Sequence, residues 1–267
     1  MRLSNYVDSL DLQMDESYRG DCPFCDGKNT FTALKTGNKI LYNCYKATCD
    51  VRGNDLYTFT VKDAIKNKTI TYKKQEIFIV PDHIVPNRKQ VSEWASTYGL
   101  VANDIGLLYD VKEHRVVFPV VHGSITVDAT GRALRKKHIP KWKRYGSSGH
   151  AYTQGKGNIA VVVEDCISAA VVPTIHNSCT GVSLMGTALL STHILELQKY
   201  NKIIVALDPD AVQKTFVFTR QLRGLFPHIR IYAFKLEDDL KYRKENDIVG
   251  LREYVMDDSF IRRIKWN

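Results

Sequence analysis

"NIAVVVE" (158–164) and "KIIVALD" (202–208) decide the fold class of this 267-residue chain. Each is a nearly continuous apolar run that ends on an acidic residue, a pattern typical of a strand buried on both faces. "IRIYAF" (229–234) is a third such strand candidate. Helical patterns alternate with the runs, at about 167–173, at about 191–200 and up to about 223. The alternation predicts an α/β fold, with an open parallel sheet and helices on its faces.

Acidic residues stand where the apolar runs end. Glu164 closes the first run and Asp208 the second, and Asp210 follows two positions later. The carboxyl ends of parallel strands meet at one edge of a sheet, so we expect these acids to lie together. Gathered carboxylates repel one another unless a divalent cation neutralises them, and hard oxygen ligands suit Mg²⁺ or Mn²⁺. We predict a catalytic metal site for phosphoryl chemistry, to which Asp238 or Asp239 could add a ligand. The alternative is that these acids are ordinary loop or helix-cap residues.

Four cysteines in the first 50 residues have the spacing of a metal site. "CPFC" (22–25) and "CYKATC" (44–49) give C-x2-C-x18-C-x4-C, with two strand-like stretches between the pairs. Two such turns can bring four thiolates to one tetrahedral zinc ion. We predict one structural Zn²⁺ in a small β-rich ribbon, held by Cys22, Cys25, Cys44 and Cys49. The alternative is a set of free thiols or a reactive pair, and Cys166 and Cys179 are expected in the core.

A basic segment separates the cysteines from the apolar runs. The formal net charge of the chain is +9, and residues 129–163 contain eight Lys or Arg and no Asp or Glu. Trp142, Tyr145 and Tyr152 are interleaved with these cations. Cations neutralise phosphates and flat rings stack on exposed bases, so the segment predicts a surface for nucleic acid or nucleoside triphosphate. The alternative is a merely solvated charged face.

The chain is predicted to contain, in order, a small β-rich zinc domain, a linker, a basic mixed α+β subdomain, and a parallel-sheet subdomain with a helical tail. Their boundaries are 1–67, 68–87, 88–157 and 158–267. A helix is expected to begin at Asn54. The linker holds two prolines and could also be an extended segment that docks on a neighbour. The basic subdomain is expected to contain a helix that ends near Gly99 and a hairpin over 115–131.

No signal for a membrane or for secretion is found. No run approaches the roughly 18 apolar residues of a membrane-spanning helix. The first 20 residues match neither a secretory signal nor a transit peptide. We therefore expect no membrane partner and a cytoplasmic location.

Taken in order, these pieces resemble the bacterial and phage type of DNA primase, which joins a zinc ribbon to a Toprim catalytic core. "CPFC…FTA…YNCYKATCDVRGNDLYTF" is similar to the primase zinc domain, and "RVVFPVVHGSITVDATGRAL…IPKWKRY" to the basic subdomain that precedes Toprim. "VVVEDCISA" and "ALDPDA" resemble the two Toprim motifs, and "DDLKY" the acidic motif beyond them. The resemblance covers about residues 15–245. Two positions depart from it, because Asp165 stands where Toprim usually has Gly and Ser168 where it usually has Asp.

The resemblance implies a nucleotidyltransferase of DNA replication. Such an enzyme is a DNA-directed RNA polymerase that makes short RNA primers on single-stranded DNA from ribonucleoside triphosphates. Glu164, Asp208 and Asp210 would be catalytic and, with Asp239, would hold Mg²⁺. The groups that would contact the triphosphate or the template are Arg132, Lys141 and Lys143. The zinc domain would bind the template through its exposed aromatics, such as Phe24, Phe31 and Tyr42.

A missing motif makes the expected type of primase more specific, and two other protein classes remain as alternatives. No G-x-x-x-x-G-K-[ST] nucleotide loop is present, so the resemblance implies a small stand-alone phage-like primase that works with a separate replicative helicase, in the host cytoplasm if phage-encoded. One alternative is a Toprim nuclease, which has no need of the primase-like segment over 115–145. Another is a non-enzymatic recombination mediator of the RecR type, which usually has helical DNA-binding repeats before its zinc site. Only about 20 residues precede Cys22 here.

Overall fold

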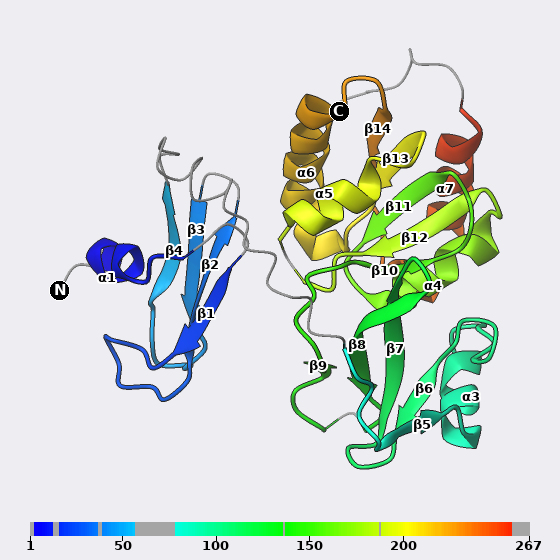
Figure 1. The fold of residues 1–267 in the computed structure, drawn as a ribbon. Coiled ribbons are helices and arrows are strands. Elements are labelled where there is room, and N and C mark those ends of the chain that lie inside the picture. Colours follow the sequence, from blue (N-terminus) through cyan, green and yellow to red (C-terminus); the bar gives the residue numbers. More distant parts are fainter. Residues whose placement is uncertain are drawn as a thin grey trace. The chain divides into compact units, whose positions relative to one another are not determined.

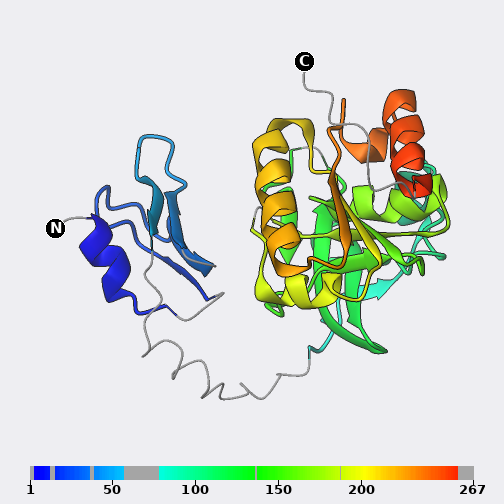
Figure 2. The same cartoon turned by 90° about the horizontal axis from the view of Figure 1, so that it is seen from above.

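The computed structural model describes residues 3–12, 16–36, 39–56, 78–135, 137–186 and 188–257 (Figures 1 and 2). The chain forms two compact units, Met1–Glu76 and Ile77–Asn267. The first contains both cysteine pairs, and the second contains the basic segment and the three apolar runs. The expected fold class is confirmed: a β-rich unit with a four-cysteine cluster is followed by a mixed α/β unit.

The first unit is an antiparallel sheet with one helix. Its elements are α1 (Leu3–Ser9), β1 (Ser17–Gly20), β2 (Phe31–Thr36), β3 (Lys39–Cys44) and β4 (Arg52–Leu56), with the strands in chain order across the sheet. Burial alternates along β2, so Phe31 and Ala33 form a small core to which α1 adds Val7. The two strands expected between the cysteine pairs are confirmed.

Two expectations for this unit are wrong. Asn54 does not begin a helix: it lies in β4 and pairs with Leu41 of β3, where it continues the hydrogen-bonded ladder. The rest of that expected helix, 57–67, lies outside the described residues. Phe31 cannot meet a template strand because it is fully buried, whereas Phe24 is 44% exposed and Tyr45 is 66% exposed. An aromatic that alternates with polar residues in a strand more often faces the core than the solvent.

The second unit begins with an antiparallel sheet. Its elements are β5 (Ile84–Pro86), α3 (Lys89–Ser96), β6 (Leu108–Asp110), β7 (Arg115–His122), β8 (Ile125–Ala133) and β9 (Trp142–Arg144). The hairpin expected over 115–131 is β7 and β8, and the turn at Gly99 that follows α3 has a φ of +64°. β5 lies in the segment 68–87, expected as a linker or a docked extended segment. Its described part is docked: β5 pairs with β6, and Phe78 packs beside it.

A second, mostly parallel sheet completes the unit. Its strands are β10 (Tyr152–Gln154), β11 (Ile159–Val163), β12 (Cys179–Ser183), β13 (Lys202–Val205) and β14 (Arg230–Ala233), in the order β10-β12-β11-β13-β14. The helices are α4 (Cys166–Ile175), α5 (Ser191–Leu197), α6 (Val212–Leu225) and α7 (Glu245–Met256), with the short 3₁₀ turns η1 (Pro209–Ala211) and η2 (Leu240–Tyr242). The expected parallel strands are confirmed. Two further strands were not expected: β12, which pairs parallel to β11, and the edge strand β10, which is antiparallel to β12.

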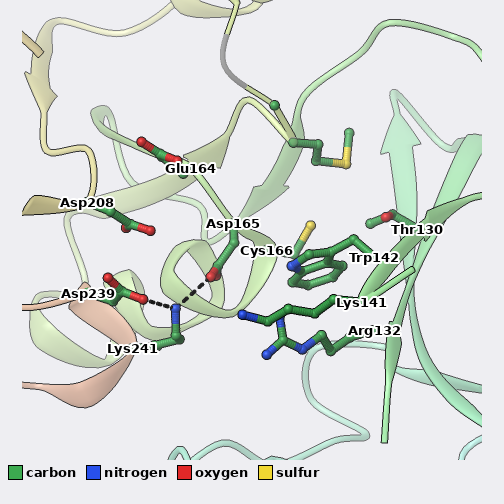
Figure 3. A pocket seen from close by; sticks show the side chains of 12 residues that line it. Thr130, Arg132, Lys141, Trp142, Glu164, Asp165, Cys166, Asp208, Asp239 and Lys241 are labelled. Atoms are coloured by element: carbon green, nitrogen blue, oxygen red, sulfur yellow. Dashed lines mark hydrogen bonds and ion pairs between the residues drawn. The ribbon is translucent and has the colours of Figure 1, made fainter. Parts of the chain in front are cut away.

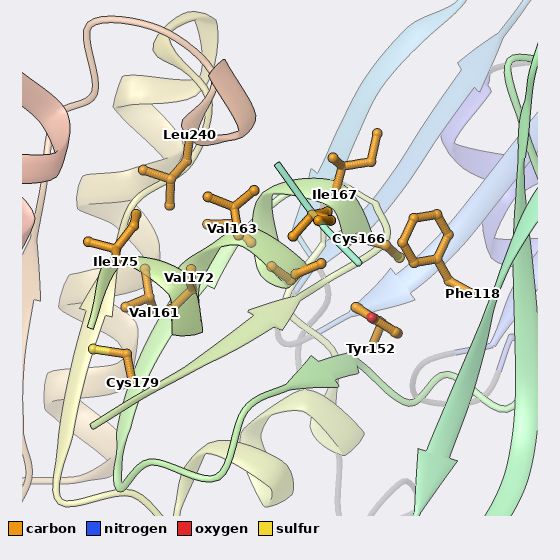
Figure 4. Packing of buried hydrophobic residues seen from close by; sticks show 14 of the residues in the cluster. Phe118, Tyr152, Val161, Val163, Cys166, Ile167, Val172, Ile175, Cys179 and Leu240 are labelled. Atoms are coloured by element: carbon orange, nitrogen blue, oxygen red, sulfur yellow. The ribbon is translucent and has the colours of Figure 1, made fainter. Parts of the chain in front are cut away.

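The two faces of this sheet are covered by different helices. Val161 and Val163 of β11 belong to a core shared with α4 and α7, whereas Ala160 and Val162 belong to a core shared with α5 and α6. Because side chains alternate along a strand, one apolar run can serve both cores. Figure 4 shows the first of them, which extends from α4 to Phe118 of β7, so that the two sheets of the unit share one core. Cys166 and Cys179 lie within it, as expected.

Among the described helices, none combines the length and the apolar character needed to cross a membrane.

Candidate functional site

The four cysteines of the first unit converge on one point. Their Sγ atoms all lie within 4.8 Å of one another, with 3.7 Å between Cys25 and Cys44 and 4.0 Å between Cys22 and Cys49. Four sulfurs at about 2.3 Å from a tetrahedral zinc ion lie about 3.8 Å apart. The donor set and its spacing therefore fit structural zinc.

Local turns place these sulfurs. Cys22 donates its backbone N–H to the Gly27 carbonyl at 2.9 Å, and Cys49 donates to the Lys46 carbonyl at 2.9 Å. The second turn shows how the wide "CYKATC" spacing still returns its last sulfur to the cluster. Thr30 lies 3.3 Å from the Cys44 sulfur, and this hydrogen bond lowers the pKa of Cys44 to about 6. Burial raises the pKa of Cys22. The pKa values of Cys25 and Cys49 are also raised, so one thiolate forms readily and a metal must displace the protons of the other three thiols.

A second cluster lies at the carboxyl edge of the parallel sheet. Asp165, Asp208 and Asp239 follow β11, β13 and β14 respectively, and each offers a carboxylate oxygen within 4.8 Å of the other two. All three hold the N-cap position of the next helical turn, but only Asp165 accepts a capping hydrogen bond, from the Ser168 N–H. Capping therefore does not account for Asp208 or Asp239, and the carboxylates of both remain available for a cation.

Lys241 is the cation inside this cluster. Its Nζ donates to Asp165 Oδ2 at 2.9 Å and also contacts the Asp239 carboxylate, and the side chain is 5% exposed. Asp208 Oδ1, in contrast, is buried and has no hydrogen-bond partner among the described residues. Burial, together with the neighbouring Asp239 and Asp165, raises the pKa of Asp208 to about 7. A buried carboxylate oxygen with no partner is costly, and a divalent ion would satisfy it.

The acids line one wall of a cavity of about 280 Å³. Figure 3 shows Asp165, Asp208 and Asp239 gathered around Lys241, with Arg132, Lys141 and Trp142 on the facing wall. The facing wall comes from β8 and β9 of the antiparallel sheet and from the residue before β9. The Arg132 guanidinium lies over the Trp142 ring, 5.2 Å from its centroid, a cation–π contact that favours this arrangement of the two side chains.

The predicted acidic residues occupy different positions relative to the cluster and the cavity. Asp208 and Asp239 are in the cluster, and Glu164 lines the same cavity without being one of its three members. Burial and then the charge of Asp210 raise the pKa of Glu164, so these two acids lie near each other. Asp210 itself is exposed and is not part of the cavity lining. Asp165 was not predicted as a ligand. Its position directly after a buried strand, like that of Asp208, was the available signal.

The structure also sorts the predicted cations. Arg132 and Lys141 line the cavity, but Lys143 does not. Lys143 is paired with Glu113, whose pKa Lys143 and Arg115 lower to about 2. Arg144 is likewise paired with Asp128 at 2.9 Å. Part of the basic segment is therefore structural. Lys241 was not predicted as a site residue, although it lies in the "DDLKY" motif.

The cavity thus combines two chemistries. One wall presents carboxylates that can hold a divalent cation, and the other presents a guanidinium, an ammonium and an indole ring. Cations on one side and metal-binding carboxylates on the other suit a polyphosphate that carries a metal ion.

Comparison with known proteins supports the resemblance to primases. No family model matches the chain. A DNA primase of Legionella pneumophila is 27% identical over 158 residues, which are 54% of this chain and 27% of that protein. The chain therefore matches only about a quarter of the length of that curated relative.

Two solved structures are also similar. The Aquifex aeolicus primase, comprising its zinc-binding and RNA polymerase domains, matches with a TM-score of 0.51 at 15% identity, over 94% of this chain and 82% of that one. The likeness shows that the chain shares that fold. The RNA polymerase domain of Mycobacterium tuberculosis primase matches less well, with a TM-score of 0.43 at 16% identity, over 73% of this chain and 76% of that one. Sequence and fold together show a likeness to the bacterial type of primase.

Proposed function

We propose that this chain is a bacterial-type primase that makes short RNA primers on single-stranded DNA from ribonucleoside triphosphates. The observation that carries the proposal is the cavity in which Asp208 and its neighbours face Arg132 and Lys141, within a fold similar to primase zinc-binding and polymerase domains. The proposal includes a Toprim-type catalytic core, a cytoplasmic location and a separate replicative helicase as partner.

The carboxylates fit Mg²⁺ or Mn²⁺ by their oxygen donors and by the unpartnered Oδ1 of Asp208. Asp208 and Asp239 would hold the ion, with Glu164 at the rim of the same cavity. When bound, the ion would stabilise the charge that develops on the leaving pyrophosphate. The exposed Asp210 would contribute to the site through its charge, which acts on Glu164.

The facing wall would bind the nucleotide. Arg132 and Lys141 would neutralise the triphosphate, and the Trp142 ring offers a flat surface beside them. Because the guanidinium of Arg132 is held over Trp142, little side-chain freedom would be lost on binding. Lys143 remains a candidate for the template strand, with its charge shared with Glu113.

The zinc unit would bind the template. Phe24, between Cys22 and Cys25, and Tyr45, directly after Cys44, are both exposed, so both rings are available for stacking on unpaired bases. The zinc ion would fix the two turns that carry them. It takes no part in the chemistry, since four thiolates leave a tetrahedral ion no open position.

A primer-synthesis assay tests the proposal. The full chain, single-stranded templates, labelled ribonucleotides and Mg²⁺ should yield short oligoribonucleotides whose sequence follows the template. Asp208→Asn should abolish the product, and Asp104→Asn, a change at an exposed loop carboxylate, should leave it intact. Cleavage of the DNA would favour the nuclease alternative, and binding without synthesis would favour the mediator. Either result would contradict the primase proposal.

A further inference from the structure

Lys241 stands where a metal ion would be expected. Phosphoryl-transfer sites commonly use two divalent ions held by shared carboxylates. Here the ammonium of a buried lysine already lies between Asp165 and Asp239, two of the three clustered carboxylates. We propose that Lys241 is a fixed internal cation that replaces one metal ion, so that the cavity binds a single divalent ion, at Asp208. The inference rests on one part of the proposed function, namely that the clustered carboxylates bind a divalent ion.

The position of the ammonium is built into the fold. Lys241 is the middle residue of η2, whose turn is closed by Tyr242 N–H donating to the Asp239 carbonyl at 2.9 Å and by Arg243 N–H donating to the Leu240 carbonyl at 3.0 Å. Leu240 is fully buried in the core beneath α4 and anchors the turn. The lysine side chain is therefore directed into the cluster and not toward solvent.

The hydrogen bonds of the cluster are divided unevenly. Both oxygens of Asp165 have a hydrogen-bond partner, since Oδ1 accepts the Ser168 N–H at 2.8 Å and Oδ2 accepts from Lys241. Asp239 shares the same ammonium. Asp208 has no such partner among the described residues, and its buried Oδ1 is open. Lys241 thus satisfies the side of the cluster that faces α4 and η2, and leaves one place for an ion at the end of β13.

The alternative is a purely structural ion pair that holds η2 against α4. Metal counting separates the two roles, since an ion pair with only a structural role would not change how many ions bind. Mn²⁺ is titrated into zinc-loaded full-length protein, and the bound ions are counted by electron paramagnetic resonance and calorimetry. The variants are Lys241→Met, which removes the charge, and Lys241→Arg, which keeps it. The matched control is Lys199→Met, which removes an exposed lysine paired with Glu196.

The wild type, Lys241→Arg and Lys199→Met are expected to bind one Mn²⁺, and Asp208→Asn none. Lys241→Met is expected to bind a second Mn²⁺, at the Asp165 and Asp239 carboxylates that have lost their ammonium partner. Two ions in the wild type, or a single ion in folded Lys241→Met, would overturn the inference.

Loss of the buried charge could also unfold Lys241→Met. In that case millimolar Mn²⁺ is expected to restore its unfolding temperature toward that of the wild type, because the ion takes the place of the ammonium. An unfolding temperature that Mn²⁺ does not raise would contradict the inference. No template or nucleotide enters these titrations. A metal count that contradicts this inference would therefore not contradict primer synthesis. A failure to synthesise primers would likewise not change the expected metal count.

Discussion

The zinc ribbon and the carboxyl edge of the parallel sheet both gather metal ligands, but in opposite ways. In the ribbon, four sulfurs come from two turns close in the chain, at 22–25 and 44–49, and the surrounding core is small. At the sheet edge, Asp165, Asp208 and Asp239 come from three strands, and Lys241 is already paired with two of them. That edge also stands on two large hydrophobic cores.

The contrast predicts that the two metals stabilise the protein to very different extents. A ribbon with few buried side chains depends on its ion to fold. A sheet edge that is folded by its cores keeps its shape without an ion and is strained by its own charges. Metal should therefore be essential to the first unit and only stabilising to the second.

The largest expected effect is the loss of zinc. Chelation, or Cys44→Ser, should unfold the first unit, because the binding free energy of structural zinc, about 10 kcal/mol or more, exceeds what so small a core supplies. The parallel sheet should remain folded. Hydrogen exchange with mass spectrometry checks this, with fast exchange expected in β2 and β3 and continued protection in β11 and β13.

The control for this experiment is Cys179→Ser, at a thiol buried in the core of the second unit. It should keep the zinc and the protection of β2 and β3, and should cost the second unit about 1–3 kcal/mol through a buried hydroxyl. A ribbon that stays protected after its zinc has been removed would break the contrast between the two units.

A smaller effect of opposite sign is expected at the sheet edge. The folded-state pKa of Asp208, about 7, lies above its ordinary value of 3.8, so the folded state binds a proton more tightly than the unfolded state. Stability should therefore fall as pH rises from about 4 to about 7. In metal-free buffer at pH 8, Asp208→Asn should be more stable than the wild type by about 2 kcal/mol, a value reduced for partial contact with water.

Denaturant unfolding at pH 5 and pH 8, with and without Mg²⁺, checks this expectation. The variant should lose both the fall in stability with pH and the gain in stability with Mg²⁺. Asp104→Asn, at an exposed loop, supplies the baseline. A variant less stable than the wild type at pH 8 without metal would show that Asp208 has a partner that holds its charge.

The same contrast explains what the sequence could predict. The cysteine spacing was sufficient because all four ligands belong to two short turns, and the turn from Lys46 to Cys49 absorbs the wider interval. The apolar runs were sufficient for β11 and β13 because burial on both faces leaves no other pattern, and β14, an edge strand with only Ile231 buried, was still found from its apolar run. The short edge strand β10 was missed since its three residues carry no periodicity.

The members of the acidic cluster were harder to predict, because a sequence shows which residues follow a strand but not the direction of each side chain. Asp165 and Glu164 are adjacent, yet Asp165 belongs to the tight cluster and Glu164 lies beside it. Whether a cation faces the cavity also depends on a distant partner. Lys143 is drawn to Glu113, thirty positions away in the chain, and no local pattern reveals that pairing.

The smallest predicted effect tests this division of the basic segment. Arg132→Met should weaken the binding of Mg²⁺-ATP by about tenfold, since it removes a charge-assisted contact from the cavity wall and frees the Trp142 ring. Lys143→Met should change that affinity by less than about twofold and should instead lower the stability by about 1 kcal/mol, because Glu113 keeps only Arg115. Calorimetry of nucleotide binding and thermal unfolding separate the two variants. Equal losses of affinity in both would mean that the whole basic segment acts as one electrostatic surface, and that facing the cavity gives Arg132 no special role.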